Sequence, residues 1–145
     1  MNLNIIRDKE QIYQVIKACD TAFEEPVIGS CSFDILLRKI CDYAIFIEAC
    51  ANDSPLGYAA MYANDIKSRV AYLTLIAVRP DYQNMGIGSA LIEKCVCCAK
   101  NYNMKMLRLE VRKRNVNAIS FYEKHGFVIE KECSAISFFM LRKLV

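Results

Sequence analysis

A predicted strand, a loop with two glycines and a predicted helix follow one another in this chain, and this unit constrains the fold most. The strand covers residues 69–78, which are rich in β-branched and aromatic side chains. The loop contains Gly86 and Gly88, and the helix after it repeats apolar residues at helical spacing. Cys97 is expected to face solvent, and the predicted buried positions are Ile87, Leu91, Ile92, Cys95, Cys98 and Tyr102.

The start of this helix is suited to bind phosphate. The first backbone N–H groups of a helix have no partner within it, and the helix dipole adds positive charge there. Gly86 and Gly88 carry no side chain that would keep a pyrophosphate from the backbone, although glycines also occur at helix starts for packing alone. Two nucleotide motifs are excluded, because Leu91 replaces the third glycine of G-x-G-x-x-G and Ser89-Ala90 replaces Lys-Ser/Thr of the phosphate loop.

Length and composition predict one domain spanning residues 1–145. Hydrophobic residues make up 54% of the chain and charged residues 24%, which excludes a disordered chain. No apolar run reaches the ~18–20 residues of a membrane span, and the first residues lack the layout of a secretion signal. The eight cysteines accompany one histidine without zinc-site spacing. We therefore expect reduced thiols in a cytoplasmic protein with no metal and no membrane partner.

Charge is distributed unevenly along the chain. Residues 1–65 hold five Lys/Arg and ten Asp/Glu, a net charge of −5, and residues 66–145 hold fourteen and six, a net charge of +8. A basic second half suits a polyphosphate or a nucleic acid, and an acidic first half attracts a cation, but ordinary solvated surface also explains the pattern. Because stacking motifs and known signatures are lacking, we predict no nucleic-acid partner.

Two sequence motifs together resemble the GCN5-related N-acetyltransferases. Residues 83–90, which read Q-x-x-G-x-G-S-A after the strand ending at Val78, are similar to motif A of that family. Residues 107–127 read L-x-L-E-V-R-x-x-N-x-x-A-I-x-x-Y-x-x-x-G-F and are similar to motif B. Their order and separation also agree. The resemblance covers residues 70–130, and the first 65 residues fit by element order.

The resemblance implies a mixed α/β fold with a central, mostly antiparallel sheet of six or seven strands and helices on both faces. The hydrophobic pattern agrees with this fold. One helix is predicted after Asp8, with apolar residues at helical spacing from Ile12 to Phe23, and a second from Ser32 or Phe33 to about Cys41. Besides 69–78 and the strand of Leu107, Leu109 and Val111, the predicted strands are residues 3–6, 43–51, 56–62, 128–133 and 137–143.

The resemblance also implies acetyl-CoA as co-substrate, bound in a split between neighbouring strands beside a bulge in the strand ending at Val78. By similarity, backbone groups of Ile76 and Val78 would pair with the acetyl carbonyl and the pantetheine arm, and Asn115 would bond the pantetheine side. The basic residues that would meet the ribose phosphate, or equally have no role, are Lys124, Lys113 and Arg114. The loop amides that would cradle the pyrophosphate belong to Gln83, Asn84, Met85, Gly86, Ile87, Gly88 and Ser89.

Tyr122 and Glu110 are the predicted catalytic residues. Tyr122 lies one turn into a short helix capped by Asn115, and a phenol with an ordinary pKa near ~10 can protonate the departing thiolate. Glu110 points to the polar side of its strand and would take the proton of the attacking ammonium, directly or through water. The Glu110–Tyr122 spacing matches the ribosomal-protein alanine acetyltransferases. An ordinary core tyrosine and an Arg–Glu surface pair are the alternatives.

His125 and Cys133 are assigned lesser roles. His125 precedes Gly126 at a helix end, which favours a capping role. Cys133 lies near the predicted acceptor wall, but no His or Asp beside it in the sequence supports an acyl-cysteine route.

The predicted acceptor is a primary amine on a small molecule. The loop between the first two helices usually forms one acceptor wall in the family, and here Glu24 and Glu25 would help to bind a cationic group. Acetylation of a protein N-terminus is the alternative, followed by a non-catalytic acyl-CoA-binding domain. A homodimer is common in the family, and no sequence feature decides it.

Overall fold

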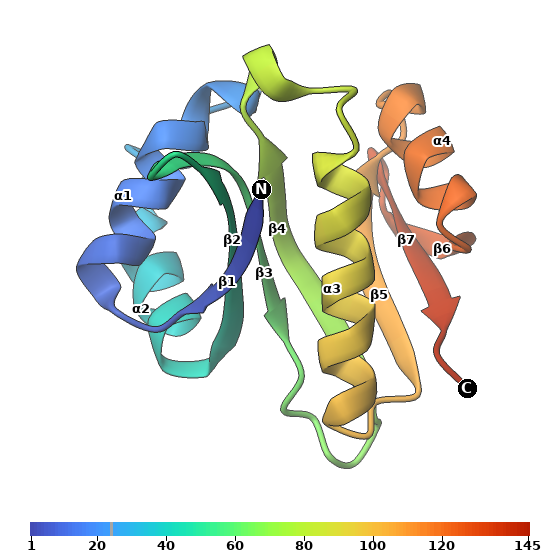
Figure 1. Cartoon of the computed structure of the whole chain (residues 1–145). Helices are drawn as coiled ribbons and strands as arrows, with labels where there is room; N and C mark the ends of the chain where they lie inside the picture. Colours follow the sequence, from blue (N-terminus) through green and yellow to red (C-terminus); the bar gives the residue numbers. More distant parts are fainter. Residues whose placement is uncertain (24) are drawn as a thin grey trace. The chain divides into compact units, whose positions relative to one another are not determined.

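The computed structural model describes residues 1–23 and 25–145, which form seven strands and four α-helices (Figure 1). The strands are β1 (Asn2–Ile6), β2 (Ala44–Ala51), β3 (Ser54–Tyr62), β4 (Val70–Val78), β5 (Met106–Arg112), β6 (Val128–Ser134) and β7 (Ser137–Lys143). The α-helices are α1 (Lys9–Cys19), α2 (Phe33–Tyr43), α3 (Ile87–Asn101) and α4 (Val116–Lys124). Two short 3-10 helices are η1 (Asp20–Ala22) and η2 (Pro80–Tyr82).

The strands are hydrogen-bonded in the order β1-β2-β3-β4-β5-β7-β6. β4 and β5 are parallel, whereas β1–β2, β5–β7 and β6–β7 are antiparallel. The predicted mixed α/β fold with a mostly antiparallel sheet is therefore confirmed. The residues divide into two compact units. The first unit is Met1–Met61 with Leu75–Cys95, and the second is Tyr62–Thr74 with Val96–Val145, so β4 and α3 each contribute to both.

In the first unit, α1 and α2 lie next to each other beside β1, β2 and β3 (blue to green in Figure 1). The carboxylate of Asp8 caps α1 by accepting a hydrogen bond from the Gln11 N–H at 3.0 Å. The buried residues of α1 recur at helical spacing and form one apolar face: Ile12, Val15, Ile16 and Cys19. The apolar residues that predicted this helix are therefore the ones that α1 buries.

The end of α1 differs from the prediction. The periodicity predicts a helix reaching about Phe23, but α1 ends at Cys19 and a 3-10 turn follows. The Asp20 carboxylate accepts hydrogen bonds from the N–H groups of Val27 at 2.8 Å and Ile28 at 3.1 Å. These bonds draw the following loop back to the end of α1.

The far end of α3 also differs from the prediction. Tyr102 is 53% exposed, because α3 ends at Asn101 and Asn103 adopts a φ of 62°. Met104, 3% exposed, occupies the buried position instead, and its N–H donates to the Ala99 carbonyl at 3.0 Å. As predicted, Cys97 is exposed, whereas Cys95 and Cys98 are buried.

In the second unit, β5 separates apolar from polar side chains. Leu107, Leu109 and Val111 are buried, and the residues between them point to the other face. β4 and β5 pair from Val70–Met106 to Leu73–Leu109, where the ladder ends although both strands continue, β4 to Val78 and β5 to Arg112. Beyond Leu73 and Leu109, the main chains of β4 and β5 are therefore no longer paired with each other.

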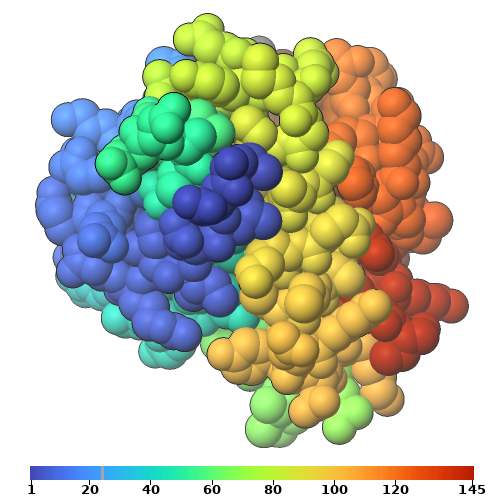
Figure 2. Space-filling model, viewed as in Figure 1, coloured from blue at the N-terminus to red at the C-terminus, as the bar shows by residue number. Residues whose placement is uncertain are grey.

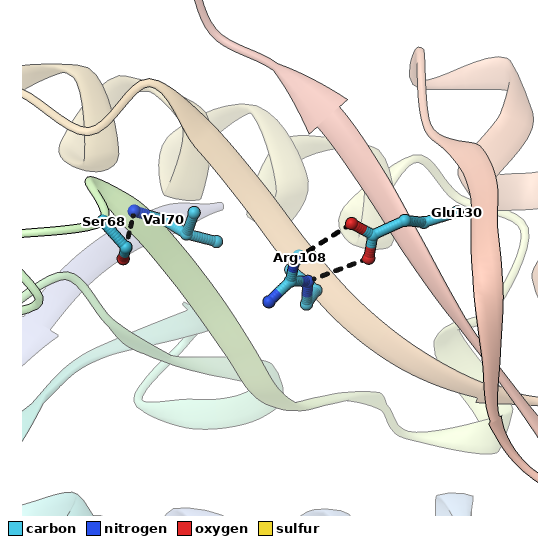
Figure 3. A network of polar contacts seen from close by, with 4 residues as sticks. All are labelled: Ser68, Val70, Arg108 and Glu130. Carbon is cyan, nitrogen blue, oxygen red and sulfur yellow. Dashed lines mark hydrogen bonds and ion pairs between the residues drawn. The ribbon is translucent and has the colours of Figure 1, made fainter.

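Charged side chains on β5 and directly after it reach across β7 to the exposed edge strand β6. Figure 3 shows Arg108 extending to Glu130, with its Nε and Nη2 atoms donating at 3.1 and 3.0 Å. The Arg108 guanidinium also lies 5.4 Å from the Phe139 ring centroid. Lys113 follows the same pattern, with an ion pair to Glu132 at 2.7 Å. Two cationic side chains therefore tie β6 to the rest of this unit.

Figure 3 also shows the start of β4, where the hydroxyl oxygen of Ser68 accepts a hydrogen bond from the Val70 N–H at 3.2 Å.

Gly57 allows β3 to approach the second half of β4 within the first unit. A Cβ at this position would lie 2.6 Å from the Ala77 carbonyl oxygen and 3.2 Å from the Val78 Cα. Both obstacles are backbone atoms, so a side chain there must displace β4.

Replacing Gly57 with alanine should lower the free energy of unfolding by about 1–3 kcal/mol, because the added methyl overpacks a closed backbone contact. Chemical denaturation at equilibrium measures this change. A loss below about 0.5 kcal/mol, the scatter of ordinary surface substitutions, would contradict the close approach.

Candidate active site

The loop between β4 and α3 is fastened to the start of β3 in the first unit. The Arg79 N–H donates to the Leu56 carbonyl at 2.8 Å, and the Arg79 Nη1 atom donates to the Ser54 hydroxyl and the Pro55 carbonyl at 3.3 and 3.2 Å. The Arg79 guanidinium also lies 5.4 Å from the ring centroid of Tyr82. The loop lies at the surface (yellow-green in Figure 2). The loop is thus accessible at the surface and is also fixed to β3 by the hydrogen bonds of Arg79.

Backbone geometry in this loop forms a turn that is able to bind an anion. Asn84 and Gly86 have φ values of 65° and 82°, with the exposed Met85 between them. Alternating left-handed residues turn successive N–H groups toward one side, which creates a concave anion site. The Ala90 N–H donates to the Gly86 carbonyl at 3.0 Å as the helix begins, whereas the Gln83 N–H already donates to the Pro80 carbonyl at 3.4 Å, so the Gln83 amide does not fit the predicted cradle.

Gly86 is required by its conformation and not by close packing. A Cβ added at this residue would meet no atom within 4 Å. Gly86 is needed because residues with a side chain rarely adopt a positive φ. The structure therefore gives no support to close packing as the reason for this glycine.

Gln83 closes the loop onto the end of β4. Its Nε2 atom donates a hydrogen bond to the Val78 carbonyl at 3.1 Å. Ile76 and Val78 themselves are half-buried at the end of the strand. The Val78 carbonyl retains a second lone pair for a ligand.

In the second unit, Glu110 lines a pocket of about 260 Å³. Its side chain is exposed, and it accepts a hydrogen bond from the Cys133 thiol. The pKa of Tyr72 is raised, chiefly because its phenol is partly buried and next because of the nearby charges of Glu110 and Cys133. The positive charge of Arg108 acts in the opposite direction. The pocket lining is Tyr72, Leu73, Thr74, Glu110, Arg112 and Ser137.

The surface ion pair expected as the alternative for Glu110 is not formed. Arg108, its neighbour on the same face, is paired with Glu130 instead. The carboxylate of Glu110 is therefore directed to a thiol and an open pocket, where it can accept a proton.

Tyr122 occupies the core of the second unit. It is 9% exposed, and its ring centroid lies 5.7 Å from Phe127 and 5.4 Å from Phe121. Packing of the ring thus restrains the direction of the hydroxyl. The predicted cap of this helix is confirmed, because the Asn115 Oδ1 atom accepts the Ala118 N–H at 3.1 Å. A ligand of Asn115 would therefore meet its Nδ2 donors.

The remaining predicted site residues are placed as follows. Lys124 is exposed at the end of α4, whereas Lys113 is engaged with Glu132. Glu25 is exposed, and Glu24 lies outside the described residues. His125 caps the end of α4, as expected, and its carbonyl accepts from the Arg142 Nη1 atom at 2.8 Å.

Sequence reasoning missed the neighbours of Glu110 in the pocket. Tyr72 is opposite Arg108 in the β4–β5 register, and Ser137 is opposite Arg112 in the β5–β7 register. Paired residues point to the same face of a sheet, so all of these side chains share the face of Glu110. The alternation of β5 placed Glu110 and Arg112 together, but the partners depend on register between distant strands.

The cysteines are free thiols, and several serve as core residues. Burial raises the pKa of Cys19 to about 11, although Arg79 lowers it and Glu48 raises it further. Among residues 1–23 and 25–145, no cluster of three or more His, Cys, Asp or Glu side chains is arranged to hold a metal ion. Over the same residues, no helix combines the length and apolar composition needed to cross a bilayer.

A model of a known protein family matches most of the chain. Residues 10–127 match the family described as Acetyltransferase (GNAT) family. The chain belongs to the GNAT acetyltransferase family. The resemblance found in the two sequence motifs is thereby confirmed.

Individual relatives of this GNAT chain agree with that result. It is 46% identical over 57 residues to the [ribosomal protein bS18]-alanine N-acetyltransferase of Escherichia coli, covering 39% of this chain and 38% of that protein. It is 43% identical over 54 residues to streptothricin acetyltransferase A of Bacillus subtilis, covering 37% and 31%. The match thus spans about a third of the length of these curated relatives.

Solved structures show the same fold. The PaiA N-acetyltransferase of Thermoplasma acidophilum, solved in complex with coenzyme A, superposes with a TM-score of 0.77. The sequence identity is 21%, and 99% of each chain is covered. This likeness supports the GNAT fold over the entire described chain.

The Cys133 thiol should react more slowly with iodoacetamide than the Cys97 thiol, although both are exposed. Desolvation of the thiol and the negative charge of Glu110 both raise the pKa of Cys133, so less of it is thiolate at pH 7.5. Replacing Glu110 with glutamine removes the charge, lowers that pKa and should accelerate labelling of Cys133 but not of Cys97. Peptide mass spectrometry follows both rates, and an unchanged Cys133 rate would contradict the contact.

Proposed function

We propose that this chain is an N-acetyltransferase that moves the acetyl group of acetyl-CoA to a primary amine of a small-molecule acceptor. The observation that carries the proposal is the pair of left-handed residues, Asn84 and Gly86, directly before α3. Their geometry suits a diphosphate, which coenzyme A carries. Family membership then identifies the class of reaction.

The residues proposed to bind acetyl-CoA are described unit by unit. In the first unit, the amides from Asn84 to Ser89 are proposed to bind the diphosphate, and the main chain of Ile76 and Val78 the acetyl carbonyl and the pantetheine arm. In the second unit, the residues assigned to the pantetheine side and the ribose phosphate are Asn115 and Lys124. The fit is supported by the fixed loop and by the exposed donors of Asn115.

The proposed chemistry is direct transfer. The Glu110 carboxylate takes a proton from the acceptor ammonium, because only the neutral amine is a nucleophile. The amine nitrogen bonds to the acetyl carbon as the carbon–sulfur bond breaks, and a main-chain N–H of β4 beyond the β4–β5 ladder stabilises the charge on the carbonyl oxygen. Tyr122 donates its proton to the departing thiolate, and the second proton that the attacking nitrogen loses as the amide forms returns through water to the Tyr122 phenolate.

A small acceptor is favoured by the size of the Glu110 pocket. Its volume of about 260 Å³ is below the ~300–1,000 Å³ of pockets that enclose drug-sized ligands. Glu25 of the first unit, with Glu24, is proposed to attract the cationic group of the acceptor. Acetylation of a protein N-terminus is the second candidate, because the relative acting on ribosomal protein bS18 matches 57 residues of this chain.

Substitutions of the two proposed catalytic residues should lower turnover without lowering cofactor affinity. Glu110→Gln and Tyr122→Phe should each reduce kcat in a thiol-release assay with acetyl-CoA and an amine panel by about 10²–10⁴-fold. Glu123→Gln, on the exposed side of α4, is the matched control. Wild-type turnover in both catalytic variants would refute these roles, and absence of thiol release by the wild-type chain with every amine would refute the activity.

The role of the loop geometry can be tested by comparing two glycines that both have a positive φ. Gly86 and Gly29 have φ values of 82° and 91°, and neither has an atom within 4 Å of an added Cβ. Gly86→Ala and Gly29→Ala should therefore each cost about 1–2 kcal/mol of stability.

Only Gly86→Ala should also weaken coenzyme A binding, by about 10-fold or more, since it reorients amides that contact the diphosphate. Calorimetric titration of both variants measures this difference. Equal affinities in the two variants would argue against a diphosphate at this loop.

A further inference from the structure

We infer that the pocket beside Glu110 accepts a free amino acid, and that Arg112 recognises the carboxylate of this acceptor. The inference rests on the proposed function, because it names the acceptor class for the same site. It concerns the second unit alone, in which every lining residue of the pocket lies.

Two opposite charges stand side by side in this pocket without neutralising each other. Glu110 and Arg112 are two residues apart on β5, so their side chains share one face, with Cα atoms about 6.6 Å apart. The cations nearest in sequence pair elsewhere, Arg108 with Glu130 and Lys113 with Glu132. The pocket thus presents a separate anion and a separate cation to a ligand.

Arg112 differs from the other cations of this region. Arg108 and Lys113 are each committed to a carboxylate on β6 and lie against a phenylalanine ring of β7. Arg112 is exposed, lines the pocket and makes no hydrogen bond or ion pair with another described side chain. Its guanidinium therefore retains the planar donor pair that binds carboxylates in bidentate fashion.

Neutral hydroxyl groups complete the pocket. Thr74 and Tyr72 come from β4 and the buried Ser137 from β7, directly opposite Arg112. Burial and the nearby Glu110 charge keep the phenol of Tyr72 protonated. These groups can bind a small polar ligand, whereas large apolar walls for a long side chain are not part of this lining.

An amino acid matches this arrangement better than the other amine classes. Its ammonium pairs with Glu110, which then takes the proton, and its carboxylate pairs with Arg112. A diamine would bring a second cation toward Arg112, and like charges repel. A peptide N-terminus offers only a neutral carbonyl oxygen at that distance, and a bulky antibiotic exceeds the volume of about 260 Å³.

The test compares free L-amino acids with the matching L-amino acid amides, with putrescine and an alanine-starting tripeptide as further probes. For the best amino acid, kcat/KM should exceed that of its amide by about 10–100-fold, the value of a charge-assisted hydrogen bond. In Arg112→Gln this ratio should approach one, through a higher acceptor KM and an unchanged acetyl-CoA KM. Arg112→Lys should restore part of it, and Arg38→Gln, an exposed arginine of α2, should keep the full ratio.

A binding measurement separates this inference from the proposed function. Calorimetry of the same amino acids against the chain saturated with coenzyme A should show binding to the wild type and loss of it in Arg112→Gln. Binding without thiol release by any amine would support the carboxylate site and overturn the proposed activity. Efficient acetylation of putrescine or the tripeptide, with no preference for acids over amides, would overturn the inference and leave the activity intact.

Discussion

The main-chain amides between β4 and α3 are the feature on which the proposed chemistry depends. A diphosphate carries charge that few neutral surfaces can bind, and oriented N–H groups at a helix start supply partial positive charge without a lysine or arginine. The left-handed conformations of Asn84 and Gly86 aim these groups, while Arg79 holds the loop to β3. Without that restraint, ordering of the loop would have to be driven by ligand binding.

The end of the β4–β5 ladder has a matching consequence in the second unit. After Leu73 and Leu109 the two strands no longer pair, and the side chains around this point belong to a pocket and not to a continuous sheet surface. Glu110 follows Leu109 directly, so the carboxylate appears at the first position beyond the ladder. A general base at such a position can meet a substrate while its strand remains anchored by β7.

Local patterns predicted most of the helices and strands and several local features. The β5 alternation placed Glu110 on the polar face, and the Asn115 cap and the end of α4 at His125 followed from short-range hydrogen bonding. What failed depends on contacts between residues distant in sequence or on backbone conformation. Asp20 ends α1 through bonds to residues seven and eight positions later, and a left-handed Asn103 exchanges Tyr102 for Met104 in the core. Tyr72 and Ser137 could not be predicted as neighbours of Glu110, because the periodicity of a sequence does not give the register between distant strands.

Titration of the wild-type chain with coenzyme A and with pantetheine, which lacks the nucleotide and its diphosphate, tests the central claim most directly. If the loop amides bind the diphosphate, calorimetry will detect coenzyme A binding and an affinity for pantetheine at least about 100-fold lower, since several charge-assisted hydrogen bonds are lost. Equal affinities for the two molecules, or no heat with folded protein and coenzyme A, would contradict the account.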